Sequence, residues 1–190
     1  MTKFIEPYNP NWKTEFENIK QVIAAELNDI IPQIDIQHVG STSVKGLFAK
    51  PILDIDIIIA DKTLLNNITL RLEKIGYNSK GEQGIPGRYA FRQNSELTPL
   101  TNKNRKWQSH HLYICYADSL ALKNHLLFRD ILKRNEELKA KYSELKIALT
   151  DNLAITREEY TSKKTEFIVS VLATAGLDEK SLWEITSVNI

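Results

Sequence analysis

Residues 38–43 read His-Val-Gly-Ser-Thr-Ser, and residues 51–59 read Pro-Ile-Leu-Asp-Ile-Asp-Ile-Ile-Ile. The second run has the composition of a buried strand, in which an ionised carboxylate is costly unless a cation lies beside it. Residues i and i+2 of a strand share a face and lie about 7 Å apart, so Asp54 and Asp56 can lean toward one ion. Oxygen ligands of this kind suit Mg²⁺ or Mn²⁺. We therefore predict that Asp54 and Asp56 hold a divalent metal.

A turn that can bind phosphate precedes this strand. Gly40 lets the backbone approach a ligand, and the hydroxyls and N–H groups of Ser41, Thr42 and Ser43 can hold phosphate oxygens. A Gly-Ser turn followed by an Asp-x-Asp strand resembles the signature of the nucleotidyltransferase superfamily. The alternative is purely structural: the carboxylates pair with basic residues, and the serines only form a turn.

Length and charge bound the classes of function. A chain of 190 residues is long enough for one domain that buries about 70% of its unfolded surface. The formal net charge of +1 gives no global field that favours duplex nucleic acid or an anionic membrane. The sequence shows neither a signal-peptide core nor a run of eighteen apolar residues, so we expect a cytoplasmic protein without a membrane partner. Cys115 lies in an apolar run, so we predict that it is a small, buried apolar side chain.

Hydrophobic periodicity predicts an α+β fold, with a nucleotidyltransferase-like mixed sheet, helices packed on one face of it, and a helical C-terminal third. The other face, or one sheet edge, is left for a site. We expect a single domain over residues 1–176, followed by a tail, 177–190, that contains a short helix around Ser181 to Ile185. The expected helices span about 10–30, 61–76, the region from 118 onward and a last helix from 156 to 176, and the expected strands span about 33–39, 52–60, 77–79, 88–93 and 110–116.

Basic residues outside the turn are candidates for binding phosphate. Arg88 and Arg92 are four residues apart on one strand, face the same side and offer planar guanidinium groups, although an exposed strand edge charged against aggregation gives the same pattern. Lys50, Arg129 and Lys164 are further cations that can neutralise a triphosphate. Lysines on helices are usually solvated, which is the alternative for Lys164.

Strand alternation places His111 and Tyr113 on one face of the strand near 110–116. We predict His111 to be a phosphate donor, a metal-proximal group or a proton carrier, and an ordinary hydrogen-bonded strand histidine is the alternative. A basic loop at Lys103 to Trp107 carries one aromatic ring that can stack on a base. Such loops are equally typical of a mobile surface, so nucleic acid is not the favoured partner.

The same motifs, with several others, resemble the GrpB family over nearly the whole chain. This resemblance implies a nucleotidyltransferase-like fold. Two positions depart from the family pattern, because Lys45 stands where a proline is usual and Tyr113 stands where a second histidine is usual. The motifs that carry the resemblance are His38 to Val44, Ala49 to Ile55, Gly84 to Arg88, Phe91-Arg92, His110 to Leu112, Phe128 to Asp130 and Tyr160-x-x-x-Lys164-x-x-Phe167-Ile168.

These observations predict a nucleotidyltransferase that moves a nucleotidyl group from a nucleoside triphosphate (NTP) to an unknown small-molecule or macromolecular acceptor. In this prediction Asp54 and Asp56 hold the metal, and His111 is a further catalytic residue. Active members of the superfamily commonly add a third carboxylate on a later strand, and residues 110–116 contain none. The alternative is therefore a non-catalytic module that uses the same fold to bind a nucleotide or another phosphorylated metabolite.

Overall fold

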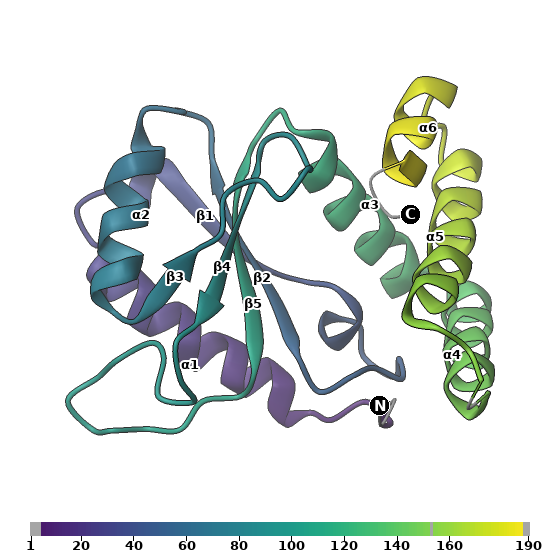
Figure 1. The fold of residues 1–190 in the computed structure, drawn as a ribbon, viewed down its shortest axis with the longest axis horizontal. Helices are drawn as coiled ribbons and strands as arrows, with labels where there is room; N and C mark the ends of the chain where they lie inside the picture. Colours follow the sequence, from purple (N-terminus) through teal and green to yellow (C-terminus); the bar gives the residue numbers. More distant parts are fainter. Residues whose placement is uncertain (1–4, 153, 188–190) are drawn as a thin grey trace.

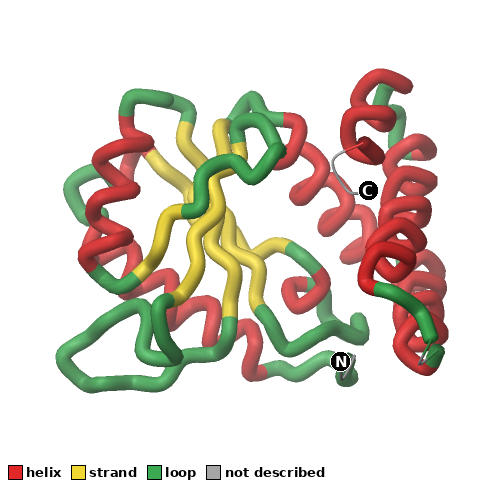
Figure 2. The backbone as a smooth tube through the Cα atoms, viewed as in Figure 1, coloured by secondary structure: helices red, strands yellow, loops and turns green. Residues whose placement is uncertain are grey.

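A five-stranded mixed sheet forms the centre of the computed structural model, which describes residues 5–152 and 154–187 (Figures 1 and 2). The strand order is β1-β2-β5-β4-β3. Each strand lies within one or two residues of the region that sequence alternation predicts for it. The strands are β1 (Ile34–Val39), β2 (Leu53–Ile59), β3 (Tyr77–Ser79), β4 (Arg88–Gln93) and β5 (His110–Tyr116).

The pairing of β2 with its neighbours sets the position of the two aspartates. β1 runs antiparallel to β2, and β5 runs parallel to β2, so β2 lies between two strands. In this register Asp54 lies opposite His111, and Asp56 lies opposite Tyr113. Side chains alternate along a strand, so all four of these residues lie on one face of the sheet, which we call the carboxylate face.

The opposite face is the main hydrophobic core. Leu53, Ile55, Ile57 and Ile59 of β2 are fully buried there against the apolar sides of two helices. The first helix ends at Glu26, earlier than the predicted residue 30, because Leu27 leaves helical geometry and a short 3-10 turn with Pro32 leads into β1. These two helices are α1 (Asn11–Glu26) and α2 (Leu64–Lys74).

The remaining helices lie on the side of the carboxylate face, so helices cover both faces of the sheet rather than one face as predicted. Figure 1 shows α3 next to the sheet, with α4, α5 and α6 beyond it. Contacts join α3 to each of these three helices as well as to β1 and β5. The helices are α3 (Leu120–Arg134), α4 (Glu136–Asp151), α5 (Arg157–Thr174) and α6 (Glu179–Ser187).

The architecture confirms the predicted α+β class with a mixed sheet and a helical C-terminal third. Within the described ranges, none of the helices is long and apolar enough to cross a membrane. Polar side chains gather on the carboxylate face of the sheet, next to α3.

Candidate functional site

Gly40 brings the backbone of the turn directly against the first aspartate. Its φ of +67° and ψ of −174° lie in a region that only glycine readily adopts. A Cβ atom at this position would overlap the Asp54 Oδ2 atom. Both the conformation and the close approach therefore require glycine, and they hold the Asp54 carboxylate at the start of the 3-10 turn Ser41–Ser43.

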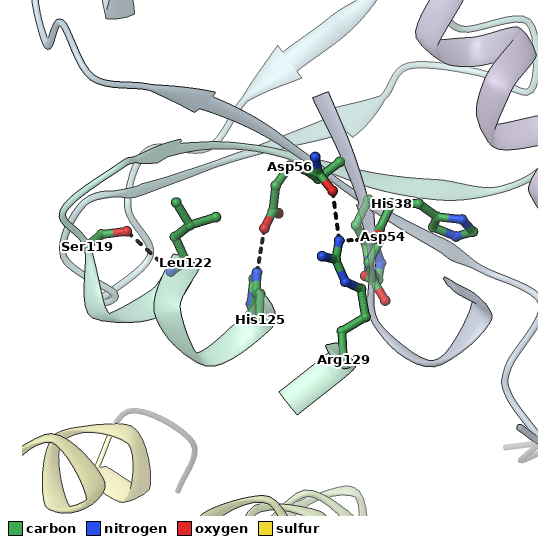
Figure 3. A network of polar contacts seen from close by, with 9 residues as sticks. His38, Asp54, Asp56, Ser119, Leu122, His125 and Arg129 are labelled. Carbon is green, nitrogen blue, oxygen red and sulfur yellow. Dashed lines mark hydrogen bonds and ion pairs between the residues drawn. The ribbon is translucent and has the colours of Figure 1, made fainter. Parts of the chain in front are cut away.

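The two aspartates share the carboxylate face but have different surroundings. The Asp54 side chain is about one-third exposed, and its Oδ1 atom accepts a hydrogen bond of 3.0 Å from His111 Nδ1. Asp56 is fully buried, and its Oδ2 atom accepts a hydrogen bond of 2.8 Å from Nδ1 of His125 on α3. Figure 3 shows His125 and Arg129 projecting from α3 toward the sheet, with His125 directed at Asp56.

The carboxylate face fits a divalent cation. Asp56 Oδ1 is buried and has no hydrogen-bond partner among the described residues, and a buried unpaired carboxylate oxygen carries a large desolvation cost. A cation bound at Asp56 would satisfy this oxygen. Carboxylate oxygens are hard ligands, so the pair suits Mg²⁺ or Mn²⁺.

Asp56 controls the charge of the groups around it. Burial disfavours the charged form of His125, but the charge and hydrogen bond of Asp56 outweigh burial and raise the pKa of His125. Burial, together with Asp56, raises the pKa of the Cys115 thiol. Cys115 is fully buried, as predicted, and the thiol stays protonated at neutral pH.

A cavity of about 230 Å³ opens between the carboxylate face and the helices. Gly40, Ser41 and Asp54 line it from the sheet side, and Lys164 of α5 lines it from the helical side. A neighbouring cavity of about 550 Å³ shares Asn124, His125 and Ile185 with it. The second cavity lies within the usual size range of small-molecule sites, and the first is smaller. We call them the first and second cavities.

Lys146 lies beneath the turn and is the most deeply buried lysine of the described chain. It is 2% exposed, donates a hydrogen bond of 3.2 Å to Ser41 Oγ and donates another to the Phe48 carbonyl. Burial, and then the nearby charge of Lys164, lowers the pKa of Lys146 to about 7. A phosphate beside Ser41 would favour the protonated form of this lysine.

The hydroxyl side chains of the turn diverge, whereas the sequence predicts that they act together. A 3-10 turn has three residues per turn, so successive side chains point in three directions. Ser41 faces the first cavity, while the buried Thr42 hydroxyl lies 3.0 Å from His38 Nε2 and Ser43 Oγ donates to the Gly40 carbonyl. Ser41 is therefore the hydroxyl of this turn that can meet a ligand in the first cavity.

The two arginines of β4 share the carboxylate face, as predicted, but lie at opposite ends of the strand. Arg88 is opposite Cys115 in the register, with its guanidinium carbon 4.7 Å from the centre of the Tyr113 ring, and it lines the second cavity. Arg92 is exposed and lies opposite His111. Four residues of strand separate the two Cα atoms by about 13 Å, and the two guanidinium groups have different surroundings.

The other predicted cations are placed differently from one another. Arg129 lines the first cavity, but it already donates hydrogen bonds to Gln37, the His38 carbonyl and Asp130. Lys164 lines the same cavity, with its amine 5.4 Å from the centre of the Tyr160 ring. Lys50 lies over the same ring at 4.9 Å and is exposed. Lys164 is thus the predicted cation best placed for phosphate.

Sequence reasoning missed His125 and Lys146. His125 precedes Arg129 by four residues, so the two share a face of α3, and this spacing was the available signal. Lys146 follows Tyr142 by four residues, which places a lysine on the apolar stripe of α4. Neither spacing reveals the distant partner, because Asp56 and Ser41 lie 69 and 105 residues away along the chain.

Sequence comparison places the chain among known proteins. Residues 3–174 match the family model described as GrpB protein. The chain belongs to the GrpB family. YqkA of Bacillus subtilis (strain 168) is 30% identical over 161 residues, which cover 85% of this chain and 43% of YqkA. The chain thus spans less than half the length of that relative, and the names of such relatives specify no reaction.

Structure comparison gives the fold of GrpB proteins a wider context. The crystal structure of GrpB from Enterococcus faecalis has a TM-score of 0.70 and 27% identity, and the similarity covers 97% of this chain and 98% of that one. The Cid1 poly(U) polymerase bound to MgATP has a TM-score of 0.61 and 18% identity, over 87% of this chain and 51% of Cid1. The GrpB fold of this chain is therefore nucleotidyltransferase-like.

Proposed function

We propose that this GrpB protein transfers a nucleotidyl group from a nucleoside triphosphate to an acceptor, with Mg²⁺ or Mn²⁺ held by Asp54 and Asp56. The observation that carries the proposal is the carboxylate pair itself. A glycine turn packs against Asp54, and Asp56 keeps one buried oxygen unpaired on the same face. The fold similarity to a polymerase solved with MgATP supports it.

The residues of the first cavity have distinct roles in this proposal. Ser41 and Lys164 bind the terminal phosphates, and Lys146 supports Ser41 from below. The bound metal supplies positive charge that polarises the phosphate under attack. His111 orients Asp54 through its hydrogen bond, and His125 does the same for Asp56.

The experiment measures pyrophosphate release with ATP, GTP, CTP and UTP in turn, with Mg²⁺ or Mn²⁺ and a deproteinised cell extract as the acceptor pool. We expect release with the wild type and at least a hundredfold loss in Asp54→Asn. Asp35→Asn is the matched control, because Asp35 is an exposed aspartate of the neighbouring strand β1. Equal release by Asp54→Asn and Asp35→Asn contradicts the metal assignment.

A second candidate function is a binding module without catalysis. Tyr113 supports it, because this residue lies opposite Asp56 on β5, where a third carboxylate would be expected in an active nucleotidyltransferase. Burial, then the charge of Asp54, raises the pKa of Tyr113, so the phenol is no base at neutral pH. Triphosphate binding by calorimetry without any pyrophosphate release would favour this candidate. The absence of both would contradict the two functions together.

A further inference from the structure

A further cavity, lined by basic residues and distinct from the first and second cavities, lies on the outer side of the Gly-Ser turn. It measures about 480 Å³ and is formed by α1, the edge strand β1, the segment after the turn and α3. Thr42, Ser43 and Arg129 line it, and Arg129 also lines the first cavity. The turn therefore separates two cavities that share one arginine. We call this one the lysine cavity.

Four lysines from three segments converge on the lysine cavity. Lys13 and Lys20 belong to α1, Lys45 follows the turn, and Lys133 belongs to α3. Among the described residues, none of these lysines forms an ion pair with a carboxylate. The concentration of charge is local, because the whole chain has a formal net charge of only +1. Four amines from separate elements offer donors from several sides, as an anion with several oxygens requires.

The remaining charged groups around the lysine cavity leave this excess in place. Glu17 of α1 is the carboxylate that lines it. Arg129 is held by Asp130 and by oxygens of β1, so this arginine and aspartate largely cancel. Burial keeps His38 neutral, since it lowers the pKa of that imidazole to about 4. The four lysines and the one uncompensated carboxylate, Glu17, together leave an excess of three positive charges.

The cations of the lysine cavity also act on one another. Burial lowers the pKa of Lys133, and the charges of Arg129 and Lys13 lower it further, while Asp130 opposes them. Mutual repulsion of this kind is relieved when an anion lies between the cations. The wall behind them is aromatic, with Lys20 Nζ 5.8 Å from the centre of the Phe16 ring and that ring stacked on His38.

We propose that the lysine cavity binds a small ligand carrying at least two phosphate groups, at a site separate from the first cavity. A volume of about 480 Å³ is that of a small-molecule cleft, which favours such a ligand over a nucleic-acid strand. The excess of three positive charges matches two adjacent phosphates. This binding does not require nucleotidyl transfer, so it stands or falls independently of the proposed reaction.

The test is calorimetric titration of the full chain with inorganic tripolyphosphate at low salt. The double variant Lys13→Gln/Lys133→Gln removes two exposed amines of the lysine cavity. The matched control is Lys163→Gln/Lys180→Gln, which removes two exposed amines from α5 and α6 and changes the net charge equally. Lys164→Gln tests the first cavity separately. All variants are first compared with the wild type by circular dichroism and thermal unfolding.

We expect the Lys13→Gln/Lys133→Gln variant to weaken tripolyphosphate binding at least tenfold, whereas the control double variant and Lys164→Gln keep this binding event. Equal affinity in the two double variants would overturn the proposal. So would the absence of any binding by the wild type, or the loss of all binding in Lys164→Gln. Tighter binding of a twelve-nucleotide single-stranded RNA than of tripolyphosphate, lost in the same double variant, would replace the small ligand by a nucleic acid.

Discussion

Gly40 combines an unusual backbone conformation with a close contact to the predicted metal ligand Asp54. Its positive-φ conformation turns the chain out of β1, and its missing side chain makes room for the Asp54 carboxylate. The same residue therefore shapes the turn and positions a predicted metal ligand. A second glycine of the chain, Gly81, has nearly the same φ and open space around it, so it is the comparison site for a glycine-to-alanine substitution.

We predict that Gly40→Ala destabilises the protein more than Gly81→Ala. Both substitutions place alanine at a positive φ, +67° and +66°, which costs on the order of 1 kcal/mol or more. Gly81 has no atom within 4 Å of the added Cβ, whereas Gly40 has the Asp54 carboxylate. Urea unfolding of both variants measures the difference. Equal losses of unfolding free energy would show that the contact with Asp54 is unimportant.

Lys146 makes the stability of the protein depend on pH. Its pKa is about 7 in the folded state and near the ordinary lysine value of 10.5 when unfolded. Between these values the unfolded state binds more protons, so the free energy of unfolding rises with pH, by at most about 1.4 kcal/mol per pH unit. Urea unfolding from pH 7 to 8 should show this rise, because an unfolded cysteine, with a pKa near 8.5, is still mostly protonated over this range.

The Lys146→Met variant should lose this rise, because methionine fills the same space without a proton to release. Lys141→Met is the control on the same helix, since Lys141 is exposed and pairs with Glu137. We expect the control to keep the slope of the wild type. A wild-type slope in Lys146→Met would show that another group causes the pH dependence.

Two helices carry the candidate site from opposite sides. α3 presents His125 and Arg129 to the sheet, and α5 presents Lys164 and Thr165 to the first cavity. Helix α5 begins at a capping box, in which Thr156 Oγ1 accepts from the Glu159 N–H and the Glu159 side chain accepts from the Thr156 N–H. The start of this helix, about two helical turns before Lys164, therefore supports the position of Lys164.

We predict that Thr156→Ala lowers the free energy of unfolding by about 1 kcal/mol, because it leaves helix N–H groups without a partner. Thr174→Ala is the control at the other end of α5, where the hydroxyl only donates to the Val171 carbonyl within the helix. Chemical denaturation compares the two variants. A loss in Thr174→Ala as large as that in Thr156→Ala would contradict the role of the cap.

The whole molecule should lose stability in mild acid because the buried His110 and the partly buried His38 are held without charge. Burial lowers the pKa of His38 and of His110 to about 4, and the unfolded value is near 6.5. Between these values the unfolded state binds more protons, so the free energy of unfolding falls as pH falls from 6.5 to 4. The pKa of His125 is raised, so this residue is protonated in both states below 6.5 and adds little to the slope.

His110→Gln tests this acid sensitivity. His110 is buried and its Nε2 atom lies 2.7 Å from the Tyr77 hydroxyl, whereas its neighbour His111 is exposed. We expect His110→Gln to lose about half of the fall in stability between pH 6.5 and 4.5, and His111→Gln to keep the wild-type fall. Unfolding free energies from urea titrations at these pH values measure it. An unchanged fall in His110→Gln would exclude this histidine as a cause.

Local sequence determined the strands and helices, the Gly-Ser turn and the Asp-x-Asp strand. Alternation predicts β2 with Asp54 and Asp56 on one face, and Gly40 predicts the turn, because strand periodicity and backbone freedom act over only a few residues. The order of the motifs indicates the GrpB family, which the family match confirms. The same reasoning places Arg88 and Arg92 on one side of β4, although it cannot show that Arg88 lines the second cavity while Arg92 is exposed.

Only the tertiary structure decided which distant groups meet. The parallel pairing of β2 with β5 puts His111 beside Asp54, and helix packing brings His125 to Asp56 and Lys146 to Ser41. The placement of α3 over the carboxylate face, rather than all helices on the other face, is a further outcome of packing. Contacts between residues this far apart depend on how whole elements bury their apolar sides, and no local pattern encodes that arrangement.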